Sequence, residues 1–399
     1  MNSRDYAFLT TALGVRVLAD LAAADLSDAG TLGLLTRLRK TLAPEQAAAA
    51  VEQAKLRVKA AAKFGADAER MFFTRDGLEQ ASDPRIRRYR AAEASGRALI
   101  IDACCGIGTD ALSFAAAPGE RRTVLGLDLD AVRVEVARYN AAALGLDNAR
   151  FEVLDVRRPL PETAELVFFD PARRDSNGRR LQHVEQYLPA LSSLKAWDAP
   201  YVWAKLSPAV DLDETRAYGG LIEFHSVDGD LKEAMLRINR IPTPANAFDG
   251  QLTSAIRHDA GGAEVWKWRK APPAVDEREP RGWLLEPDPA LMRAGYVQHL
   301  AAQLGAAQLD ATIAYLTIDA RPDTPWARAW EILDWMPFSL KRLKATLRAQ
   351  GVGRVTVKKR GHAMTPEDLQ AALRLDGKGE ERVVVLTRVK GQPAVIICR

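Results

Sequence analysis

Each of four short apolar runs in the middle of the chain ends in an aspartate. The four are Asp102, Asp128, Asp155 and Asp170. Unbroken apolar runs are typical of parallel strands buried on both faces, and ligands of open α/β sheets bind beside the carboxyl ends of the strands. A single aspartate at such a place is often an ordinary helix cap. The ordered set of four predicts that these carboxylates converge on one crevice.

A glycine-containing loop follows the first run. Gly106 and Gly108 come shortly after Asp102 and precede a segment with helical periodicity. Glycine lets the backbone turn sharply and approach a ligand, and the N-terminus of the next helix offers free N–H groups. Gly106, Gly108 and Ala111 also fit the relaxed G-x-G-x-x-G/A fingerprint of nicotinamide and flavin enzymes. A dinucleotide-dependent oxidoreductase is therefore one alternative.

The acidic residues favour a different cofactor. Asp102 lies four residues before the first glycine, where it would repel a pyrophosphate but pair with the ammonium of an amino-acid ligand. Asp128 ends the second run, where a carboxylate accepts hydrogen bonds from both hydroxyls of a ribose. Asp155 suits the exocyclic amine of an adenine. We therefore expect S-adenosylmethionine.

With these motifs, residues 91–235 resemble a class I S-adenosylmethionine-dependent methyltransferase. The resemblance implies a Rossmann-like α/β fold, with the methionine part of the cofactor at the glycine loop, the ribose at Asp128 and the adenine at Asp155. The cofactor-binding residues that it implies are Asp102, Ala103, Cys104, Gly106, Gly108, Asp128, Leu129, Asp155 and Val156.

The fourth run continues into Asp170-Pro171-Ala172-Arg173. In the resemblance this is the place where amino-methyltransferases of nucleic acids carry (Asp/Asn)-Pro-Pro-(Tyr/Phe). Here Ala172 replaces the second proline and Arg173 replaces the aromatic ring, so the motif alone does not assure methylation of a base nitrogen. We predict Arg173 as a substrate-binding residue.

A ribose hydroxyl is the other acceptor to consider. Asp170 and Lys205 stand on successive strand ends of the predicted sheet. Together with Lys63 and either Glu223 or Glu233, they loosely resemble the Lys-Asp-Lys-Glu set of ribose 2′-O-methyltransferases. Such a hydroxyl must lose its proton, whereas a nitrogen lone pair needs chiefly to be positioned. We predict Asp170 and Lys205 as catalytic residues in either case.

The cysteines exclude one large class of methyltransferase. Methylation at C5 of a pyrimidine needs a thiolate that attacks C6. Cys104 and Cys105 belong to the glycine loop, and Cys398 lies near the C-terminus, so we expect no cysteine-dependent C5 mechanism. The 3 cysteines form no disulfide framework, and the 5 histidines show no ligand spacing. We therefore expect no metal.

The ends of the chain carry a more specific resemblance. Segments 285–290, 313–317 and 357–361 are similar to those of bacterial methyltransferases with a C-terminal THUMP-like domain, and segments 63–66 and 72–80 agree with this. The resemblance spans nearly the whole chain. It implies an RNA substrate.

A basic window supports nucleic-acid contact. Between Trp335 and Pro366 there are eight Lys and Arg residues and no acid. Leu343 and Leu347 at helical spacing predict a buried stripe with the cations turned outward. Such a patch attracts phosphates, although charged helix faces are often merely solvated. The predicted RNA-binding residues are Lys341, Lys344, Arg348, Lys358, Lys359 and Arg360.

Three parts are expected along the chain. Residues 1–90 have helical periodicity, residues 91–280 form the methyltransferase core with its trailing segment, and residues 281–399 form a small α/β THUMP-like domain. Within the second part, Arg240–Pro280 contains several prolines and predicts an irregular connection that can hold a hairpin near residues 265–268. No apolar run approaches the length of a membrane span. We expect a cytoplasmic α/β enzyme that uses S-adenosylmethionine and RNA, with no membrane partner; a non-catalytic RNA-binding protein with a vestigial pocket is the other alternative.

Overall fold

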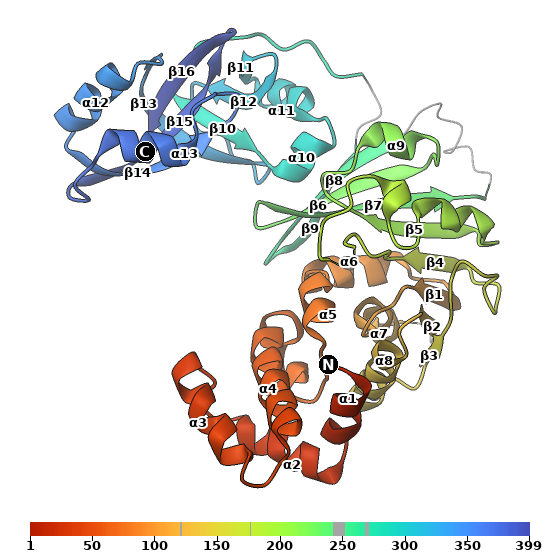
Figure 1. Cartoon of the computed structure of the whole chain (residues 1–399). Helices are drawn as coiled ribbons and strands as arrows, with labels where there is room; N and C mark the ends of the chain where they lie inside the picture. The colour runs from red at the N-terminus through yellow and green to blue at the C-terminus, as the bar shows by residue number, and fades with distance from the viewer. Residues whose placement is uncertain (120–121, 176, 242–251, 268–270) are drawn as a thin grey trace. The chain divides into compact units, whose positions relative to one another are not determined.

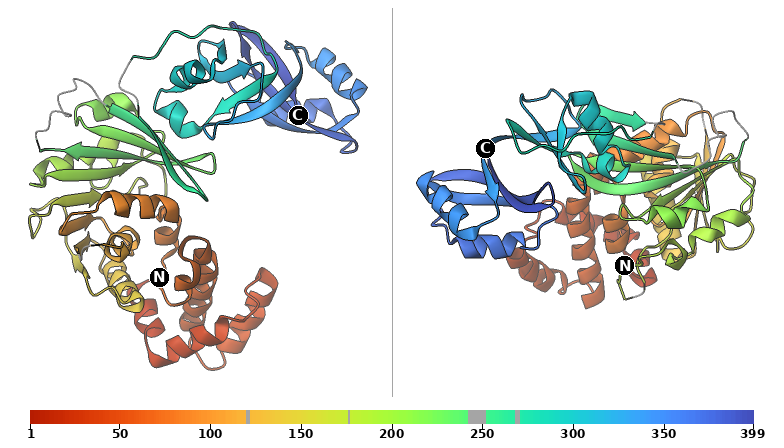
Figure 2. Two further views of the ribbon diagram at one scale, coloured as in Figure 1. Left: turned by 180° about the vertical axis from the view of Figure 1, so that it is seen from behind. Right: turned by 90° about the horizontal axis from the view of Figure 1, so that it is seen from above.

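The structure is a computed structural model that describes residues 1–119, 122–175, 177–241, 252–267 and 271–399. The chain divides into two compact units (Figures 1 and 2). Unit 1 comprises Met1–Val227, Lys232–Leu252 and His258–Ala263, and unit 2 comprises Asp228–Leu231, Thr253–Arg257 and Glu264–Arg399. The three-part division at residues 90/91 and 280/281 stays a prediction.

Unit 1 begins with helices, as the periodicity predicts, and residues 1–96 contain no strand. Side chains of Asn2, Thr11 and Ser27 accept hydrogen bonds from first-turn N–H groups and so fix the starts of the first three helices. The helices are α1 (Ser3–Leu9), α2 (Ala12–Leu21), α3 (Asp28–Leu38), α4 (Pro44–Phe64), α5 (Arg75–Gln80) and α6 (Pro84–Glu93). No described helix is long and apolar enough to span a membrane.

A nine-stranded sheet follows. Its elements are β1 (Leu99–Ala103), α7 (Thr109–Ala116), β2 (Thr123–Asp128), α8 (Ala131–Leu144), β3 (Ala149–Val153), β4 (Leu166–Phe169), β5 (Tyr201–Leu206), α9 (Leu212–Arg216), β6 (Leu221–Val227), β7 (Asp230–Asn239), β8 (Leu252–Asp259) and β9 (Gly262–Lys267). The strand order is β3-β2-β1-β4-β5-β7-β6-β8-β9. Strands β1 to β5 pair in parallel, and β7 pairs antiparallel with β5.

This order confirms the predicted Rossmann-like α/β fold. The chain reverses its direction of winding between β1 and β4, and the crevice at such a switch point is where open α/β sheets bind ligands. Helix α8 starts at its cap Asp130 and ends at Gly145, which has a φ of 70°. Strand β3 ends at Val153, so Asp155 follows the strand by two residues rather than closing it.

The N-terminal helices and the sheet share one hydrophobic core. Phe72 and Phe73 are fully buried in a cluster that also contains Ile100 and Val136. The buried amide of Asn140 in α8 accepts a hydrogen bond from the Phe72 N–H at 2.7 Å and donates one to its carbonyl at 3.0 Å. The helical region is therefore bound to the sheet by both apolar and polar contacts.

The expectation of an irregular connection over Arg240–Pro280 is wrong for its central part, whereas the hairpin expected within it is present, since β8 and β9 are consecutive neighbouring strands. Strands β8 and β9 belong to the large sheet. The buried polar residues Ser254 and His258 interrupt the apolar pattern of β8, so the pattern of the sequence does not predict this strand. Residues 242–251, including Pro242 and Pro244, and residues 268–270 lie outside the described part.

Unit 2 contains a second, seven-stranded sheet with the order β11-β12-β10-β13-β16-β15-β14. Buried Leu343 and Leu347 of its helix α12 pack with Val384 and Val395, which confirms the predicted leucine stripe. The elements are β10 (Trp283–Pro287), α10 (Pro289–Arg293), α11 (Val297–Leu304), β11 (Ala307–Asp310), β12 (Ile313–Ile318), β13 (Ala327–Pro337), α12 (Leu340–Ala349), β14 (Val352–Lys359), α13 (Pro366–Leu373), β15 (Glu380–Val389) and β16 (Gln392–Cys398).

Candidate functional site

A cavity of about 540 Å³ lies at the carboxyl ends of the parallel strands of unit 1. The predicted residues among its lining are Asp102, Cys104, Gly106, Asp128, Leu129, Asp155, Val156 and Asp170. The four aspartates thus meet at one cavity, as the sequence predicts, although Asp155 follows its strand by two residues. Ala103 and Gly108 do not line it: the Ala103 carbonyl accepts a hydrogen bond from the Asp170 N–H at 3.2 Å, and Gly108 caps α7.

The loop between β1 and α7 is held close to the cavity by its backbone. Cys104, Gly106 and Gly108 have φ values of 68°, 56° and 87°. A Cβ on Gly108 would meet the Cβ of Ala137 at 3.0 Å and the Phe151 ring at 3.1 Å, so only glycine lets the loop pack this tightly. The Gly106 N–H donates to Asp128 Oδ2 at 2.9 Å.

Asp102 is the most unusual of the four carboxylates. Its Oδ2 accepts a hydrogen bond from the Ala111 N–H at 2.9 Å, whereas its Oδ1 is buried and has no partner among the described residues. Burial, followed by the nearby charges of Asp110 and Asp170, raises the pKa of Asp102 well above its ordinary value. An orphaned buried carboxylate oxygen is costly, and an ammonium group reaching it would satisfy it. This fits the methionine part of S-adenosylmethionine.

Asp128 and Leu129 suit the nucleoside part of the same cofactor. Each carboxylate oxygen of Asp128 accepts one N–H, from Gly106 at 2.9 Å and from Asp130 at 2.9 Å. A carboxylate has about four acceptor sites, so both oxygens remain able to accept from vicinal hydroxyls. The Leu129 side chain is 66% exposed where it borders the cavity, which offers an apolar face to a flat ring.

Asp155 is held by a neighbour. Arg157 binds its carboxylate at 2.6 Å and 2.9 Å, and these side-chain hydrogen bonds lower the pKa of Asp155 to about 2. Asp155 is therefore an ionised acceptor at the cavity edge. An adenine amine would share this carboxylate with Arg157, which the sequence did not predict.

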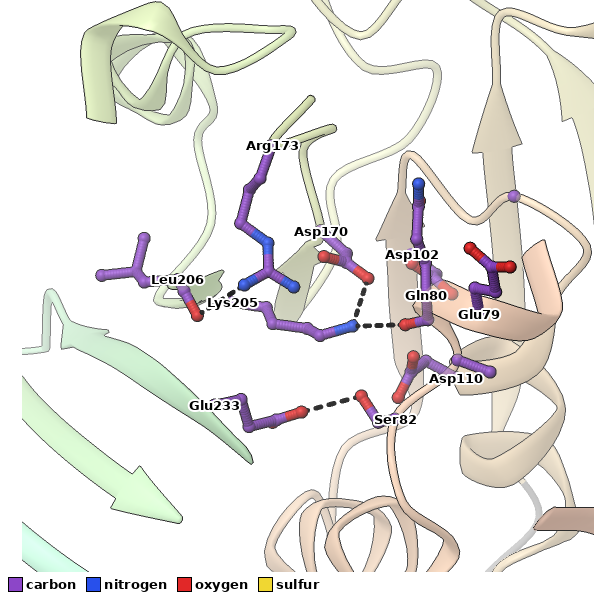
Figure 3. Close-up of polar contacts among 12 residues, drawn as sticks. Glu79, Gln80, Ser82, Asp102, Asp110, Asp170, Arg173, Lys205, Leu206 and Glu233 are labelled. Carbon is purple, nitrogen blue, oxygen red and sulfur yellow. Dashed lines mark hydrogen bonds and ion pairs between the residues drawn. The ribbon is translucent and has the colours of Figure 1, made fainter. Parts of the chain in front are cut away.

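Asp170 forms an ion pair with a buried lysine (Figure 3). Lys205 Nζ donates to Asp170 Oδ2 at 2.7 Å and to the Gln80 carbonyl at 3.2 Å. Lys205 is 2% exposed and is not part of the lining. The structure therefore brings the two predicted catalytic residues together, but only Asp170 faces the cavity, and Lys205 reaches it through that carboxylate.

The other members of the predicted Lys-Asp-Lys-Glu set have separate partners. Lys63 Nζ donates to the carbonyls of Leu78 at 2.9 Å and Ala81 at 2.6 Å. Glu233 accepts from Ser82 Oγ at 2.8 Å and pairs with the buried Arg90, which also binds Asp110. Glu223 pairs with Arg237 at 2.6 Å. Among the described residues, no hydrogen bond or ion pair joins Lys63 or Glu233 to Asp170 or Lys205, because both are held by these other partners.

Helix α5 supplies a wall of the cavity that the sequence reasoning missed. Gly77, Gln80 and Ala81 line the cavity together with residues of the sheet. Lys63 donates to the Leu78 carbonyl and Lys205 to the Gln80 carbonyl (the latter in Figure 3), at the C-terminal end of α5, where cations are favoured by the helix dipole. Because this segment precedes β1, no strand-end pattern marks it.

The predicted RNA-binding residues lie in both units. In unit 1, the Arg173 guanidinium donates to the Leu206 carbonyl at 3.2 Å. In unit 2, Lys341 and Arg348 are exposed on α12, and Lys344 is partly buried. Lys358 and Arg360 bind Glu286 at 2.7 Å and 3.5 Å, so they are partly neutralised, whereas Lys359 has no ion-pair partner among the described residues. Within that part of the chain, no group of three or more His, Cys, Asp or Glu side chains is placed to hold a metal ion.

Three parts of the chain match known families of protein domains. A methyltransferase domain model matches residues 95–185, a THUMP domain-like model matches residues 327–399, and a domain of unknown function matches residues 3–60. The chain is 35% identical, over 85% of its length and 92% of the relative's, to an uncharacterized S-adenosylmethionine-dependent methyltransferase of Mycobacterium tuberculosis. It is 36% identical to an uncharacterized RNA methyltransferase of Gloeobacter violaceus, over 25% of this chain and 21% of the relative.

A solved structure from Porphyromonas gingivalis W83, provisionally named a methyltransferase, is similar with a TM-score of 0.73. The match covers 93% of this chain and 98% of that one at 19% identity. At this identity the likeness shows that the two chains share a fold.

Proposed function

Because the chain belongs to the S-adenosylmethionine-dependent methyltransferases, we propose that it methylates a base nitrogen of RNA at the cavity of unit 1. The observation that carries the choice of acceptor is the ion pair between Asp170 and Lys205, at 2.7 Å. An RNA substrate is supported by the THUMP domain-like match and by the similarity to a protein named as an RNA methyltransferase. An RNA substrate also favours the cytoplasm as its location.

The chemistry of the pair favours nitrogen over a ribose hydroxyl. A carboxylate paired with an ammonium group is a weak base, and Lys205 already donates to two oxygens. A hydroxyl needs a base strong enough to take its proton as the methyl arrives. A nitrogen that has received a methyl group is cationic and gives up its proton readily, so a weak base is sufficient.

The residues of the cavity then have distinct roles. S-adenosylmethionine, when bound, supplies an electrophilic methyl group on its sulfonium. Asp170 accepts a hydrogen bond from the N–H of the target base, which orients the nitrogen lone pair, and it takes the proton that this nitrogen loses after transfer. Lys205 holds Asp170 in place and is a positioning residue. Asp102 and Asp128 hold the cofactor in the orientation that the transfer requires.

The thiols of this chain support the exclusion of a cysteine-dependent mechanism. Burial raises the pKa of Cys104 and Cys105 well above the ordinary value, and it raises the pKa of Cys398 to about 12. A nucleophilic cysteine needs the thiolate form, which these environments disfavour.

Methylation of RNA in vitro tests the proposal directly. The protein is incubated with S-adenosylmethionine carrying a deuterated methyl group and with total RNA from a strain that lacks the gene, and the digested nucleosides are analysed by mass spectrometry. We expect the label on a base. Label on a ribose would reassign the acceptor to the hydroxyl, and label on no nucleoside, under conditions in which S-adenosylhomocysteine binds, would refute an RNA substrate.

The basic face of α12 gives a second test of RNA binding. We expect Lys341→Glu/Lys344→Glu/Arg348→Glu to reduce the slope of log affinity against log salt by about 0.7–0.9 for each lost phosphate contact. S-adenosylhomocysteine affinity should not change, because none of these residues lines the cavity. Fluorescence anisotropy over a salt series measures both the affinity and the slope.

The control for this test changes the same number of charges elsewhere. Arg37, Arg39 and Lys40 are exposed at the end of α3, and their replacement by Glu should leave the slope as it is in the wild type. Equal slopes for all three proteins would mean that the α12 face is only solvated surface.

A further inference from the structure

A short antiparallel pairing of the backbone follows the cavity residue Ala172. Arg174 and Arg180 form an antiparallel bridge. Two backbone hydrogen bonds flank this bridge, from the Asp175 N–H to the Arg179 carbonyl at 3.0 Å and from the Leu181 N–H to the Arg173 carbonyl at 2.9 Å. The two arginines are therefore a non-hydrogen-bonded pair, the arrangement in which opposite Cα atoms are only about 4.5 Å apart.

This arrangement places two positively charged residues directly opposite each other. Residues directly opposite in an antiparallel pair project to the same face, and like charges there are destabilising. Both arginines are exposed, and neither pairs with a carboxylate among the described residues. The carboxylate of Asp175 accepts instead from the backbone N–H groups of Asn177 and Arg179 at 2.9 Å each, and the Arg174 guanidinium donates to the Gly178 carbonyl at 2.8 Å.

The pair lies beside the methyl-transfer site. Ala172 and Leu188 both line the cavity and exchange two backbone hydrogen bonds, of 2.9 Å and 3.0 Å, which anchor the base of the paired segment. Arg174 is four residues beyond Asp170, so their Cα atoms are at most about 14 Å apart, because an extended chain spans at most about 3.6 Å per residue. The preceding Arg173 side chain extends to the Leu206 carbonyl (Figure 3).

We propose that Arg174 and Arg180 bind a phosphodiester group of the RNA whose base enters the cavity. This inference rests on the proposed function. An anion between the two guanidinium groups would remove their repulsion, and a phosphate oxygen pair matches the planar fork of arginine. Phosphate contacts fix the register of a nucleic acid without reading its sequence, so the arginine pair positions the target nucleotide over Asp170.

The test compares two variants that each remove two positive charges. In Arg174→Gln/Arg180→Gln, we expect the Kd for a short fluorescein-labelled single-stranded RNA of mixed sequence to rise about ten- to hundred-fold, as for the loss of charged hydrogen bonds. The salt slope should fall by about 0.7 for one lost phosphate contact. Arg37→Gln/Arg39→Gln, on exposed residues of α3 and its end, should bind as the wild type does.

Further readouts separate this inference from the proposed function and from misfolding. The Arg174→Gln/Arg180→Gln protein should keep its S-adenosylhomocysteine affinity and a Tm within a few degrees of the wild type, because the relief of repulsion offsets the loss of the exposed hydrogen bond from Arg174 to the Gly178 carbonyl. Unchanged RNA affinity in a protein whose wild type methylates RNA would overturn the arginine pair alone. An equal loss of binding to poly-glutamate would show that the pair attracts any polyanion and would overturn a phosphodiester site. A wild type that neither binds nor methylates RNA would overturn both.

Discussion

Replacing Asp170 with Asn is expected to lower the turnover number for methyl transfer by about 10²- to 10⁴-fold, the range for loss of a positioned proton acceptor. The carboxylate lines the cavity and pairs with Lys205, so its removal takes away both the hydrogen bond that orients the target nitrogen and the group that takes its proton. S-adenosylhomocysteine affinity should stay within a few-fold. Single-turnover kinetics and calorimetry measure the two quantities.

Glu79→Gln is the matched control, because Glu79 lies near the site but is not part of the cavity lining (Figure 3). It should keep wild-type turnover. Lys205→Met should lower kcat with little change in KM, and Lys205→Arg should restore part of the loss, as expected for a residue that positions Asp170. Full activity in Asp170→Asn would remove Asp170 from the mechanism.

Asp102→Asn is expected to weaken S-adenosylhomocysteine binding about ten- to hundred-fold, since a charged hydrogen bond contributes roughly 1.5–3 kcal/mol. The variant keeps an oxygen that can accept from the Ala111 N–H, as Asp102 Oδ2 does at 2.9 Å. What it loses is the negative charge on the orphaned side of the carboxylate. Isothermal titration calorimetry gives the affinity of both proteins.

The pH dependence of stability and of S-adenosylhomocysteine affinity distinguishes a cofactor-binding Asp102 from a merely structural one. Burial raises the pKa of Asp102 in the folded protein, so the folded state is more stable when Asp102 is protonated. The free energy of unfolding therefore declines as the pH rises through that pKa. Asn imitates the protonated form, so the variant should be at least as stable as the wild type above the raised pKa. Affinity of the wild type should fall as the pH drops through this pKa, and affinity of the variant should not. Equal affinities of the two proteins at a pH above the raised pKa would contradict the assignment.

The strand-end aspartates were predictable because a parallel sheet gathers the carboxyl ends of its strands at one edge. Each apolar run is local, and the pairing of Asp102 with Gly126 and Phe168 in register follows from the fold itself. The leucine stripe of α12 was also predictable from a local pattern, since the helical spacing of the leucines predicts which side chains are buried.

The remaining parts of the site depend on contacts that no local pattern records. Gln80 meets Lys205 across 125 residues, and Lys358 meets Glu286 across 72 residues. The charge of a basic window can be counted in the sequence, but whether a distant acid neutralises it depends on tertiary packing. The same holds for β8, whose buried His258 has its Nε2 3.0 Å from Nδ1 of His225 on β6.

The sharing of one core by the N-terminal helices and the sheet also bears on synthesis of the chain. Arg90 is buried against Glu233, which lies 143 residues later, and at about 5–20 residues per second the ribosome makes Glu233 only about 7 to 29 s after Arg90. The backbone N–H of Phe72 likewise has its hydrogen-bond partner, Asn140, only after a further 68 residues have been made. During this interval the emerging helices expose the apolar face that later covers the sheet. The N-terminal helices of the nascent chain are therefore expected to need shielding, as by a chaperone, until the sheet has been made.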